Sequence, residues 1–347
     1  MSFWQEIDRP ILSVAPMADV TDAAFRRLIA KYSKWNERDN CVMWTEFVAA
    51  DGLMYATDEG KAQLMADLKY GDEERPNVAQ LFTGQAKSME YAAKLRAELG
   101  FDGIDINMGC PVQKISKQGA GSAMIRAPEN AKEVIRAAKQ GAGRVPVSVK
   151  TRIGYNEDEI ETWIPNLLEE DIAALTVHLR TKKQMSKVPA AWEKMPRIKE
   201  LRDKRAPDTL LIGNGDVLSS ADALQKIKRA GIDGAMVGRA LFGNPWFFDP
   251  ARELPGQLIA LPTSGVDVDS LTEETEVAAG VEMITLPERL TVMVEHTELF
   301  VELLPHKNFA TMKKHFKAYV NGFPGAAELR SELMSTNSPA DVKEIVH

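Results

Sequence analysis

A cysteine on a tight turn is the first residue in this sequence that could carry chemistry. Cys110 stands in the stretch Asp105-Ile106-Asn107-Met108-Gly109-Cys110-Pro111, at the end of an apolar run over 101–106. Gly109 and Pro111 prevent a strand or helix from continuing, so the thiol is predicted to lie on a turn at a strand end. In a barrel or an open α/β sheet, active sites form there. The alternative is a buried structural cysteine, the commoner case for this residue type.

Polar, glycine or proline residues also mark the other predicted strand ends. In chain order, these segments are Ala15-Pro16-Met17, Thr45-Glu46, Gln80, Asn107 to Cys110, Lys150-Thr151-Arg152, His178, Asn214-Gly215-Asp216 and Gly238-Arg239. Catalytic barrels collect residues from several strand ends in this way, so the set favours an active site over ordinary loop polarity.

The last two of these segments are rich in glycine. In barrels, the loops after strands seven and eight commonly form a phosphate-binding cup, because glycine lets backbone N–H groups approach a phosphate closely. Gly215 and Gly238 offer that freedom, and Arg239 adds a positive charge. The pattern indicates a phosphorylated cofactor or substrate.

The sequence allows more than one role for three of these side chains, Lys150, Gln80 and His178. A lysine that lines a barrel can form a Schiff base, clamp a phosphate or face an electron-rich ring. Gln80 can both donate and accept hydrogen bonds, which suits the edge of a flavin or a pyrimidine. His178 can act as a base or as a fixed donor, although an isolated histidine is usually structural.

Eight short apolar runs alternate with longer amphipathic segments. The apolar runs cover 11–14, 41–45, 78–82, 103–106, 145–149, 173–177, 209–212 and 234–237. The helical patterns cover 22–31, 87–99, 128–138, 157–168, 192–201 and 220–230. This alternation predicts an α/β fold, a (β/α)8 TIM barrel over residues 1–250. A doubly wound sheet is the alternative, because periodicity does not show whether the sheet closes.

A connector and a small helical domain are predicted after the barrel. The connector covers 251–285, and its residues 255–285 include six acids and no lysine or arginine. Thr285-Leu286-Pro287-Glu288 then supplies a capping box with proline in the first turn of a helix. Helices are predicted from there to Pro305, over 307–320 and over 326–334, within a helical domain at 286–347.

Composition favours an intracellular enzyme. The 347 residues carry 50 acids and 43 lysines and arginines, a net charge of −7, which argues against a wholly basic nucleic-acid binder. The two cysteines, Cys41 and Cys110, give no disulfide framework and suit a reducing compartment. No signal sequence and no membrane-spanning apolar run is recognisable. We expect a cytoplasmic enzyme that binds no metal and acts as a monomer.

Taken together, the motifs resemble the tRNA-dihydrouridine synthase (Dus) family. The matching segments are 15–22 with Phe25-Arg26, Thr45-Glu46, 79–82, 105–111, 119–122, 149–154, 177–181, 214–216 and 238–240. The resemblance covers about residues 10–250, and the C-terminal helices also resemble the family's RNA-binding domain. Two positions depart from the family pattern: Asp19 stands where many members have glycine, and Leu179 where many have a small residue.

The resemblance implies a flavoprotein that reduces the C5=C6 bond of a uridine in the tRNA D-loop, with FMN as cofactor and NADPH as electron source. Reduced FMN would deliver a hydride to C6, and Cys110 would donate a proton to C5 from the opposite side. A thiol with an ordinary pKa of about 8.5 is mostly protonated at neutral pH and therefore suits that role.

The resemblance also implies which residues bind each ligand. Those expected to contact FMN are Ala15, Pro16, Met17, Gln80, Lys150, His178, Asn214, Gly215, Asp216, Gly238 and Arg239. Those expected to contact the target uridine are Asn107, Arg152 and Arg180. For Asn107, capping of the strand end is an equally simple explanation.

A basic segment in the C-terminal helices is the candidate for tRNA binding. Residues 304–326 contain no acid. The cations of this segment are Lys307, Lys313, Lys314 and Lys317, with His306 and His315 beside them. Lys313 and Lys317 are four residues apart and share a helical face. A solvated helix face is the alternative, but in a chain of net negative charge we favour contact with RNA phosphates. Lys182, Lys183 and Lys187 would extend this surface.

Two other functions are compatible with parts of the sequence. A flavin barrel that acts on a small pyrimidine, similar to dihydroorotate dehydrogenase, would share the phosphate-binding cup, Lys150 and Cys110, but it has no need of a basic helical tail. A tRNA-binding protein without redox chemistry has no need of Cys110, Lys150 or the cup.

Overall fold

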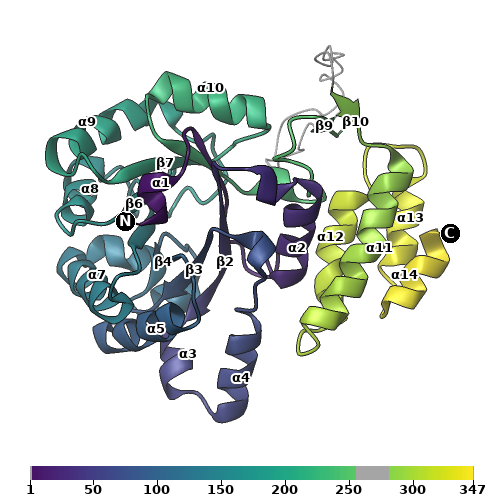
Figure 1. Cartoon of the computed structure of the whole chain (residues 1–347), viewed down its shortest axis with the longest axis horizontal. Coiled ribbons are helices and arrows are strands. Elements are labelled where there is room, and N and C mark those ends of the chain that lie inside the picture. Colours follow the sequence, from purple (N-terminus) through teal and green to yellow (C-terminus); the bar gives the residue numbers. More distant parts are fainter. Residues whose placement is uncertain (1, 255–280, 347) are drawn as a thin grey trace.

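Eight parallel strands form a closed barrel with helices around it (Figure 1). The computed structural model describes residues 2–254 and 281–346. The strands are β1 (Ile11–Val14), β2 (Cys41–Ala49), β3 (Asn77–Phe82), β4 (Gly103–Met108), β5 (Val147–Arg152), β6 (Ala174–His178), β7 (Leu210–Asn214) and β8 (Gly234–Val237). They pair in sequence order, and β8 pairs with β1. The predicted (β/α)8 barrel is confirmed, and the doubly wound alternative is excluded.

Several strands are longer than their apolar runs. β2 continues to Ala49, past the predicted end at Thr45, with a register shift between Trp44 and Phe47. β4 and β5 likewise continue through polar residues, and Asn107 pairs with Lys150 across the ladder. The apolar pattern marks only the part of each strand inside the core, whereas backbone pairing extends into the polar end of the barrel.

The helices around the barrel include all six that the sequence predicts. They are α1 (Phe3–Glu6), α2 (Ala23–Tyr32), α3 (Ala50–Tyr55), α4 (Asp58–Ala66), α5 (Ala86–Glu98), α6 (Gln113–Ser116), α7 (Pro128–Ala142), α8 (Ile160–Leu168), α9 (Met195–Arg205) and α10 (Ser220–Ala230). The additional pair α3 and α4 follows β2. α4 buries no residue fully, so its sequence lacks the apolar stripe that identifies an amphipathic helix.

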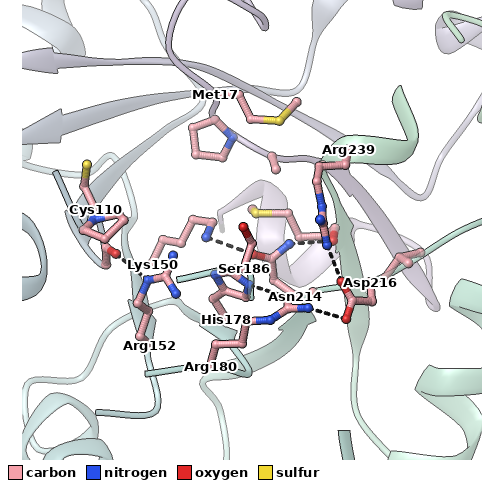
Figure 2. A pocket seen from close by; sticks show the side chains of 18 of the residues that line it. Met17, Cys110, Lys150, Arg152, His178, Arg180, Ser186, Asn214, Asp216 and Arg239 are labelled. Carbon is pink, nitrogen blue, oxygen red and sulfur yellow. Dashed lines mark hydrogen bonds and ion pairs between the residues drawn. The ribbon is translucent and has the colours of Figure 1, made fainter. Parts of the chain in front are cut away.

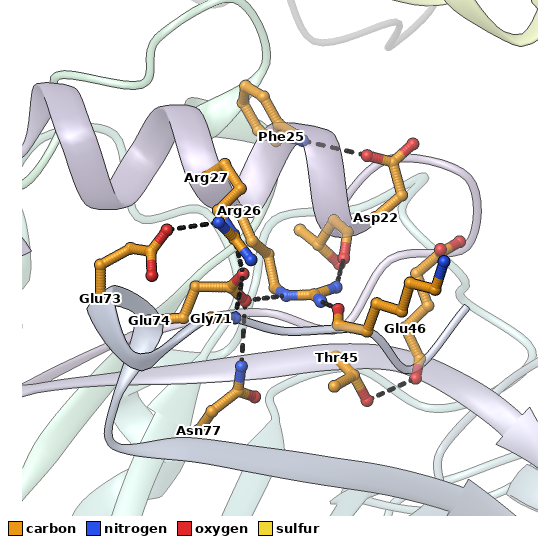
Figure 3. A network of polar contacts seen from close by, with 12 residues as sticks. Asp22, Phe25, Arg26, Arg27, Thr45, Glu46, Gly71, Glu73, Glu74 and Asn77 are labelled. Carbon is orange, nitrogen blue, oxygen red and sulfur yellow. Dashed lines mark hydrogen bonds and ion pairs between the residues drawn. The ribbon is translucent and has the colours of Figure 1, made fainter. Parts of the chain in front are cut away.

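A buried ion pair fixes α2 against the barrel (Figure 3). The side chains of Arg26 and Glu74 are fully buried, with Arg26 Nε 2.7 Å from Glu74 Oε2. The other guanidinium nitrogens donate to the carbonyl oxygens of Thr21, at 2.8 Å, and Lys69, at 2.7 Å. Glu74 Oε1 accepts a further hydrogen bond from Arg27. Because every nitrogen and carboxylate oxygen of the pair has a partner, its desolvation is compensated.

Four helices follow the barrel, and α11 packs against α2 (Figure 1). These C-terminal helices are α11 (Leu286–Leu303), α12 (Lys313–Tyr319), α13 (Ala326–Leu333) and α14 (Pro339–Val346). The predicted capping box is confirmed, since Thr285 and Glu288 exchange hydrogen bonds. The predicted helix over 307–320 is instead a 3-10 turn (Phe309–Met312) followed by α12. Asn308 starts that turn by accepting the N–H of Ala310 at 2.8 Å.

Aromatic side chains and one glycine bring the C-terminal helices close to the barrel. The Phe25 ring lies 5.2 Å from the His296 ring and 5.5 Å from the His315 ring. Gly243 has a φ of +67°, and a Cβ there would lie 2.5 Å from the carbonyl oxygen of Ala318. A larger residue at position 243 would therefore separate the two parts.

Little of the predicted connector is described. Arg252–Glu253 (β9) and Glu282–Met283 (β10) pair as a short parallel ladder, and 255–280 lie outside the described residues. Among the helices of the described chain, none is long and apolar enough to cross a membrane.

Because Glu74 is paired with the buried Arg26, its replacement should lower the free energy of unfolding more than replacement of the adjacent Glu73. Glu74→Ala leaves a buried guanidinium without its charge partner and should lower the free energy of unfolding by about 3–5 kcal/mol. Glu73→Ala removes only a partly exposed partner of Arg27 and should cost about 0–1 kcal/mol. Urea denaturation followed by circular dichroism measures both. Equal losses in the two variants would contradict the role given to the buried pair.

Candidate active site

The carboxyl ends of the strands surround a cavity of about 1020 Å³, including the open space at its mouth. Residues at or after every strand except β3 line it. The predicted site residues that line it are Ala15, Pro16, Met17, Asn107, Cys110, Lys150, Arg152, His178, Arg180, Asn214, Gly215, Asp216, Gly238 and Arg239. Figure 2 shows Cys110 on one side and the pair Asp216–Arg239 on the other, with Lys150 between them.

Gln80 is the predicted site residue of the barrel that does not line the cavity. Its side chain is fully buried, and its Nε2 donates to Asp105 Oδ2 at 2.6 Å. Its Oε1 accepts from Asn107 Nδ2 at 2.8 Å. The nitrogen and the oxygen of the amide each have a partner within the protein, and Gln80 holds Asn107 in place, while its contact with a flavin stays a prediction.

Asn107 holds the turn that carries Cys110. Its Oδ1 accepts the backbone N–H groups of Gly109, at 3.1 Å, and Cys110, at 2.9 Å. A Cβ at position 109 would lie 3.2 Å from the carbonyl carbon of Thr151, so the turn packs closely on β5. Asn107 thus caps the strand end and lines the cavity at the same time, which joins the two explanations that the sequence left open.

Arg152 fastens the Cys110 turn to the loop after β6. Its Nε donates to the carbonyl oxygen of Gly109 at 2.7 Å. Its Nη1 donates to the carbonyl oxygens of Thr181, at 3.2 Å, and Met185, at 3.1 Å. The side chain is nearly buried but still lines the cavity. Arg152 is therefore in place to fix two loops as well as to meet a ligand.

The Cys110 thiol lies in an apolar corner of the cavity wall. Ile115 and Ala120 surround it, and Phe47 and Phe82 pack against the group. Burial raises the pKa of the Cys110 thiol above its ordinary value, although the Val112 N–H and the charge of Arg152 act in the opposite direction. The thiol is therefore protonated at neutral pH, as an acid must be.

Lys150 points into the cavity and is held by Asn214. Its Nζ donates to Asn214 Oδ1 at 3.0 Å, and Asn214 Nδ2 donates to the carbonyl oxygen of Met236 at 2.8 Å. Burial, reinforced by the positive charge of Arg152, lowers the pKa of Lys150 to about 8. The ammonium group is thus poorly solvated and would be stabilised by an electron-rich or anionic ligand.

Asp216 joins two arginines on the far side of the cavity. One carboxylate oxygen accepts from Arg180 and from the N–H of Ala190, and the other accepts from Arg239. Burial alone would raise the pKa of Asp216, but the hydrogen bonds from Arg180 and Ala190 outweigh it and lower the pKa below its usual range. Asp216 is therefore a carboxylate that orients both guanidinium groups.

His178 is a neutral imidazole. Burial, followed by the charges of Arg152 and Lys150, lowers the pKa of His178 well below its ordinary value. Its Nε2 lies 3.1 Å from Arg180 Nη1, which can only donate, so the proton of the ring belongs on Nδ1. Of the two roles considered from sequence, this geometry favours the fixed donor.

The charges around the cavity indicate an anionic ligand. Its lining includes the cations Lys150, Arg152, Arg180 and Arg239, and Asp216 is the one carboxylate among the described lining residues. Gly215 has a φ of +124°, which glycine adopts readily, and a Cβ there would lie 2.7 Å from that of Ala190. Position 215 therefore requires glycine, and this residue lines the cavity. No group of three potential metal-ligating side chains occurs among the described residues.

The four lysines predicted to form one basic surface lie in different environments. Lys307 is largely buried, with Nζ 2.8 Å from Glu46 Oε2 and 3.2 Å from Asp67 Oδ1. It therefore does not belong to an open basic surface, because it is an ion-pair partner of the barrel. Lys314 lies 3.4 Å from Asp19. Lys313 and Lys317 form no ion pair within the described part of the chain.

Two histidines of the same segment also face the barrel. His306 contacts Asp67 at 3.0 Å, and His315 is fully buried. Asp67 lies between α4 and β3. The His315 ring packs against the rings of Phe25 and Phe242, and burial lowers the pKa of His315 to about 3. These partners could not be predicted from the sequence. Ser186 and Leu218 line the cavity without having been predicted. Their positions in the loops after β6 and β7 are the sequence signal that could have found them.

The closed barrel and the cationic cavity at its strand ends define a (β/α)8-barrel enzyme whose site suits an anionic ligand. The barrel is similar to 2-naphthoyl-CoA reductase, with a TM-score of 0.51 and 10% identity over 71% of this chain and 52% of that one. It is also similar to histamine dehydrogenase from Rhizobium sp. 4-9, with a TM-score of 0.50 and 12% identity over 71% and 47%. These likenesses concern the fold alone.

Sequence comparison identifies the family. The dihydrouridine synthase (Dus) family model matches residues 13–347. A probable tRNA-dihydrouridine synthase of Staphylococcus epidermidis is 36% identical over 99% of this chain and 95% of its own length. Probable tRNA-dihydrouridine synthase 2 of Bacillus subtilis is 37% identical over the same shares. The chain belongs to the dihydrouridine synthase family, which consists of flavin-dependent oxidoreductases.

The described residues fit a phosphorylated flavin. The excess of cations suits a phosphate, and Gly215 and Gly238 line the cavity together with Arg239. Lys150 offers a positive charge to the electron-rich edge of a flavin ring. The apolar corner around Cys110 belongs to the same cavity.

Flavin binding should depend on pH through Lys150. The lysine is charged below its pKa of about 8 and loses its proton above it, so flavin affinity should fall as pH rises. We expect the dissociation constant to increase roughly tenfold between pH 7 and 9.5. Flavin fluorescence titrations of the apoprotein measure it. Lys150→Met should bind more weakly at all pH values and show a flat profile, and an unchanged pH dependence in this variant would exclude Lys150 as the cause.

Proposed function

We propose that this protein reduces a uridine in the D-loop of tRNA to 5,6-dihydrouridine, with bound FMN as the flavin and NADPH as the reductant. The observation that carries the proposal is the Cys110 thiol, kept protonated on a turn that Asn107 and Arg152 hold, across the cavity from Asp216 and Arg239 (Figure 2). The names of the relatives support tRNA as the substrate.

The FMN assignment is supported by the arrangement of charges. Arg239, with the backbone at Gly215 and Gly238, would hold the phosphate, while Asp216 keeps Arg239 in place. Lys150 would face the ring, and Asn214 fixes its ammonium group. A flavin held in this way would, once reduced, be the source of the hydride for C6 of the uracil.

Cys110 would complete the reaction by donating its proton to C5. The thiol leaves this step as a thiolate, and the nearby charges of Arg152 and Lys150 stabilise that anion. Solvent then returns a proton, since the side chain keeps an exposed fraction of 9% at the cavity wall. Asn107 and Arg152 hold the turn during these steps, and with Arg180 they are the proposed contacts of the uracil.

The C-terminal helices would contact the rest of the tRNA. We propose a catalytic barrel at 1–250, a connector at 251–285 and a tRNA-binding domain at 286–347. Lys313 and Lys317 on α12 support this division, because neither forms an ion pair within the described residues and both remain able to meet phosphates. Their presence also disfavours a small pyrimidine as the natural substrate.

Loss of the thiol should stop the reduction of tRNA without loss of the flavin. Cys110→Ala is expected to retain bound FMN and to lower the rate of dihydrouridine formation by a factor of about 100 or more, since it lacks the proton donor. Mapping of dihydrouridine in unmodified tRNA incubated with protein and NADPH gives both rate and position.

Cys41→Ala is the matched control, because Cys41 is the other buried cysteine and lies outside the cavity lining. It should react at nearly the wild-type rate. Normal turnover by Cys110→Ala would refute the assignment, and reduction of free pyrimidines by the wild type at the rate of tRNA would instead favour a small-molecule enzyme.

The α12 lysines should contribute to affinity for tRNA. Reversal of charge in Lys313→Glu/Lys317→Glu is expected to weaken binding roughly tenfold at low salt and to reduce the slope of log affinity against log salt by about 1.5. Fluorescence anisotropy at several salt concentrations measures both. Lys343→Glu on α14 is an exposed control. If its effect equals that of the double variant, the α12 surface is not the binding face.

A further inference from the structure

Large apolar side chains stand exposed around the mouth of the cavity. Val112 follows the Cys110 turn, Met185 and Val188 lie in the loop after β6, and Leu218 lies in the loop after β7. Their exposed fractions are 51%, 46%, 36% and 47%. We call these four residues the collar. Apolar side chains grouped at an opening with a polar surround are typical of a binding surface.

Met185 holds its place in the collar by an uncommon backbone conformation. Its φ is +53°, a region that few residues other than glycine, asparagine and aspartate adopt. Its N–H donates to the carbonyl oxygen of Lys182 at 3.2 Å, and its own carbonyl accepts from Arg152 at 3.1 Å. Arg152 also holds the carbonyl of Gly109. One guanidinium group thus sets Met185 and the Cys110 turn relative to each other.

The two segments that carry Val112, Met185 and Val188 of the collar contain basic residues and no acid. No aspartate or glutamate occurs at 106–128 or at 172–192, the segments after β4 and through β6. Arg126 Cζ lies 5.2 Å and Lys182 Nζ 4.8 Å from the centre of the Tyr155 ring. Neither cation forms an ion pair within the described chain. Two like charges therefore share one aromatic ring, while the backbone N–H of Tyr155 donates to Glu159 Oε2 at 2.6 Å.

The collar and the two cations would bind different chemical groups of one ligand. The collar exposes apolar surface that would be stabilised by a flat apolar partner such as the face of a nucleobase. The pair Arg126 and Lys182 would be stabilised by an anion such as a backbone phosphate. An RNA strand offers both groups at close spacing, whereas an acidic peptide offers only the charge.

We propose that the collar and the Arg126–Tyr155–Lys182 group form the surface that receives the RNA strand on both sides of the target uridine. Met185 packs on a base adjacent to the extruded uridine, in the way that apolar side chains occupy a disrupted base stack in other complexes. Arg126 and Lys182 hold a neighbouring phosphate. The inference rests on the proposed function, since it takes tRNA as the substrate.

Substitutions at Met185 test the collar. Met185→Ala should lower kcat/KM for tRNA about tenfold, with the salt dependence of binding unchanged, because it removes base contact and no charge. Met185→Leu should restore most of the loss. Flavin reduction by NADPH without tRNA should be the same in both variants, which separates contact with RNA from damage to the cavity. Leu224→Ala, an exposed leucine on α10, is the control.

Substitution of the two cations tests the phosphate contact. Arg126→Gln/Lys182→Gln should weaken tRNA binding about tenfold and reduce the salt slope by about 1.5. Lys94→Gln/Lys228→Gln removes two exposed cations from α5 and α10 and should change neither quantity. Equal behaviour of the two double variants, or a wild-type kcat/KM in Met185→Ala, would overturn the proposed surface.

The two proposals can fail separately. A wild-type protein that forms no dihydrouridine in any tRNA refutes the proposed function, while the binding measurements on the same variants still report on the surface. A wild type that forms dihydrouridine, with variants that bind and react as it does, refutes the surface alone.

Discussion

The buried contact between Arg26 and Glu74 is the constraint on which the arrangement of the molecule depends. It fixes α2, which also connects to the loop after β1 and to helix α11. Through the carbonyl of Thr21, Arg26 also anchors the loop after β1, in which the Thr21 hydroxyl accepts the N–H of Met17 at 2.9 Å. On its other side, α2 packs against α11. A single helix thus aligns one wall of the cavity with the C-terminal helices.

A second buried contact completes this alignment. Burial alone would lower the pKa of Lys307, but the carboxylates of Glu46 and Asp67 outweigh it and raise the pKa above its ordinary value, so the lysine stays charged. Glu46 also accepts the N–H of Asp19, close to Met17 in the same loop. The position of the C-terminal helices and the shape of the cavity are therefore coupled by a few fully engaged side chains.

Sequence patterns predicted those features that depend on nearby residues or on the fold class. Apolar runs located the strands, and closure of a barrel then brings their ends together, so Cys110, Lys150 and Asp216 were correctly expected to meet. The partners of Gln80 and Lys307 could not be predicted, because many residues separate each pair in the chain. Lys307 looked like a free cation among lysines, and only the folded chain shows Glu46 beside it. The sequence likewise showed no sign of the contact between Met185 and Arg152.

The lowered pKa of Lys150 has a consequence for chemical labelling. With a pKa of about 8, about one tenth of this amine is uncharged at pH 7, far more than for an exposed lysine. An uncharged amine is a nucleophile, and the surrounding cations would attract an electrophile that carries a phosphate. The empty cavity should therefore direct phosphorylated aldehydes to one lysine among many. Protection of that lysine from the reagent would report how much of the protein, in a mixture or in a cell extract, holds its cofactor.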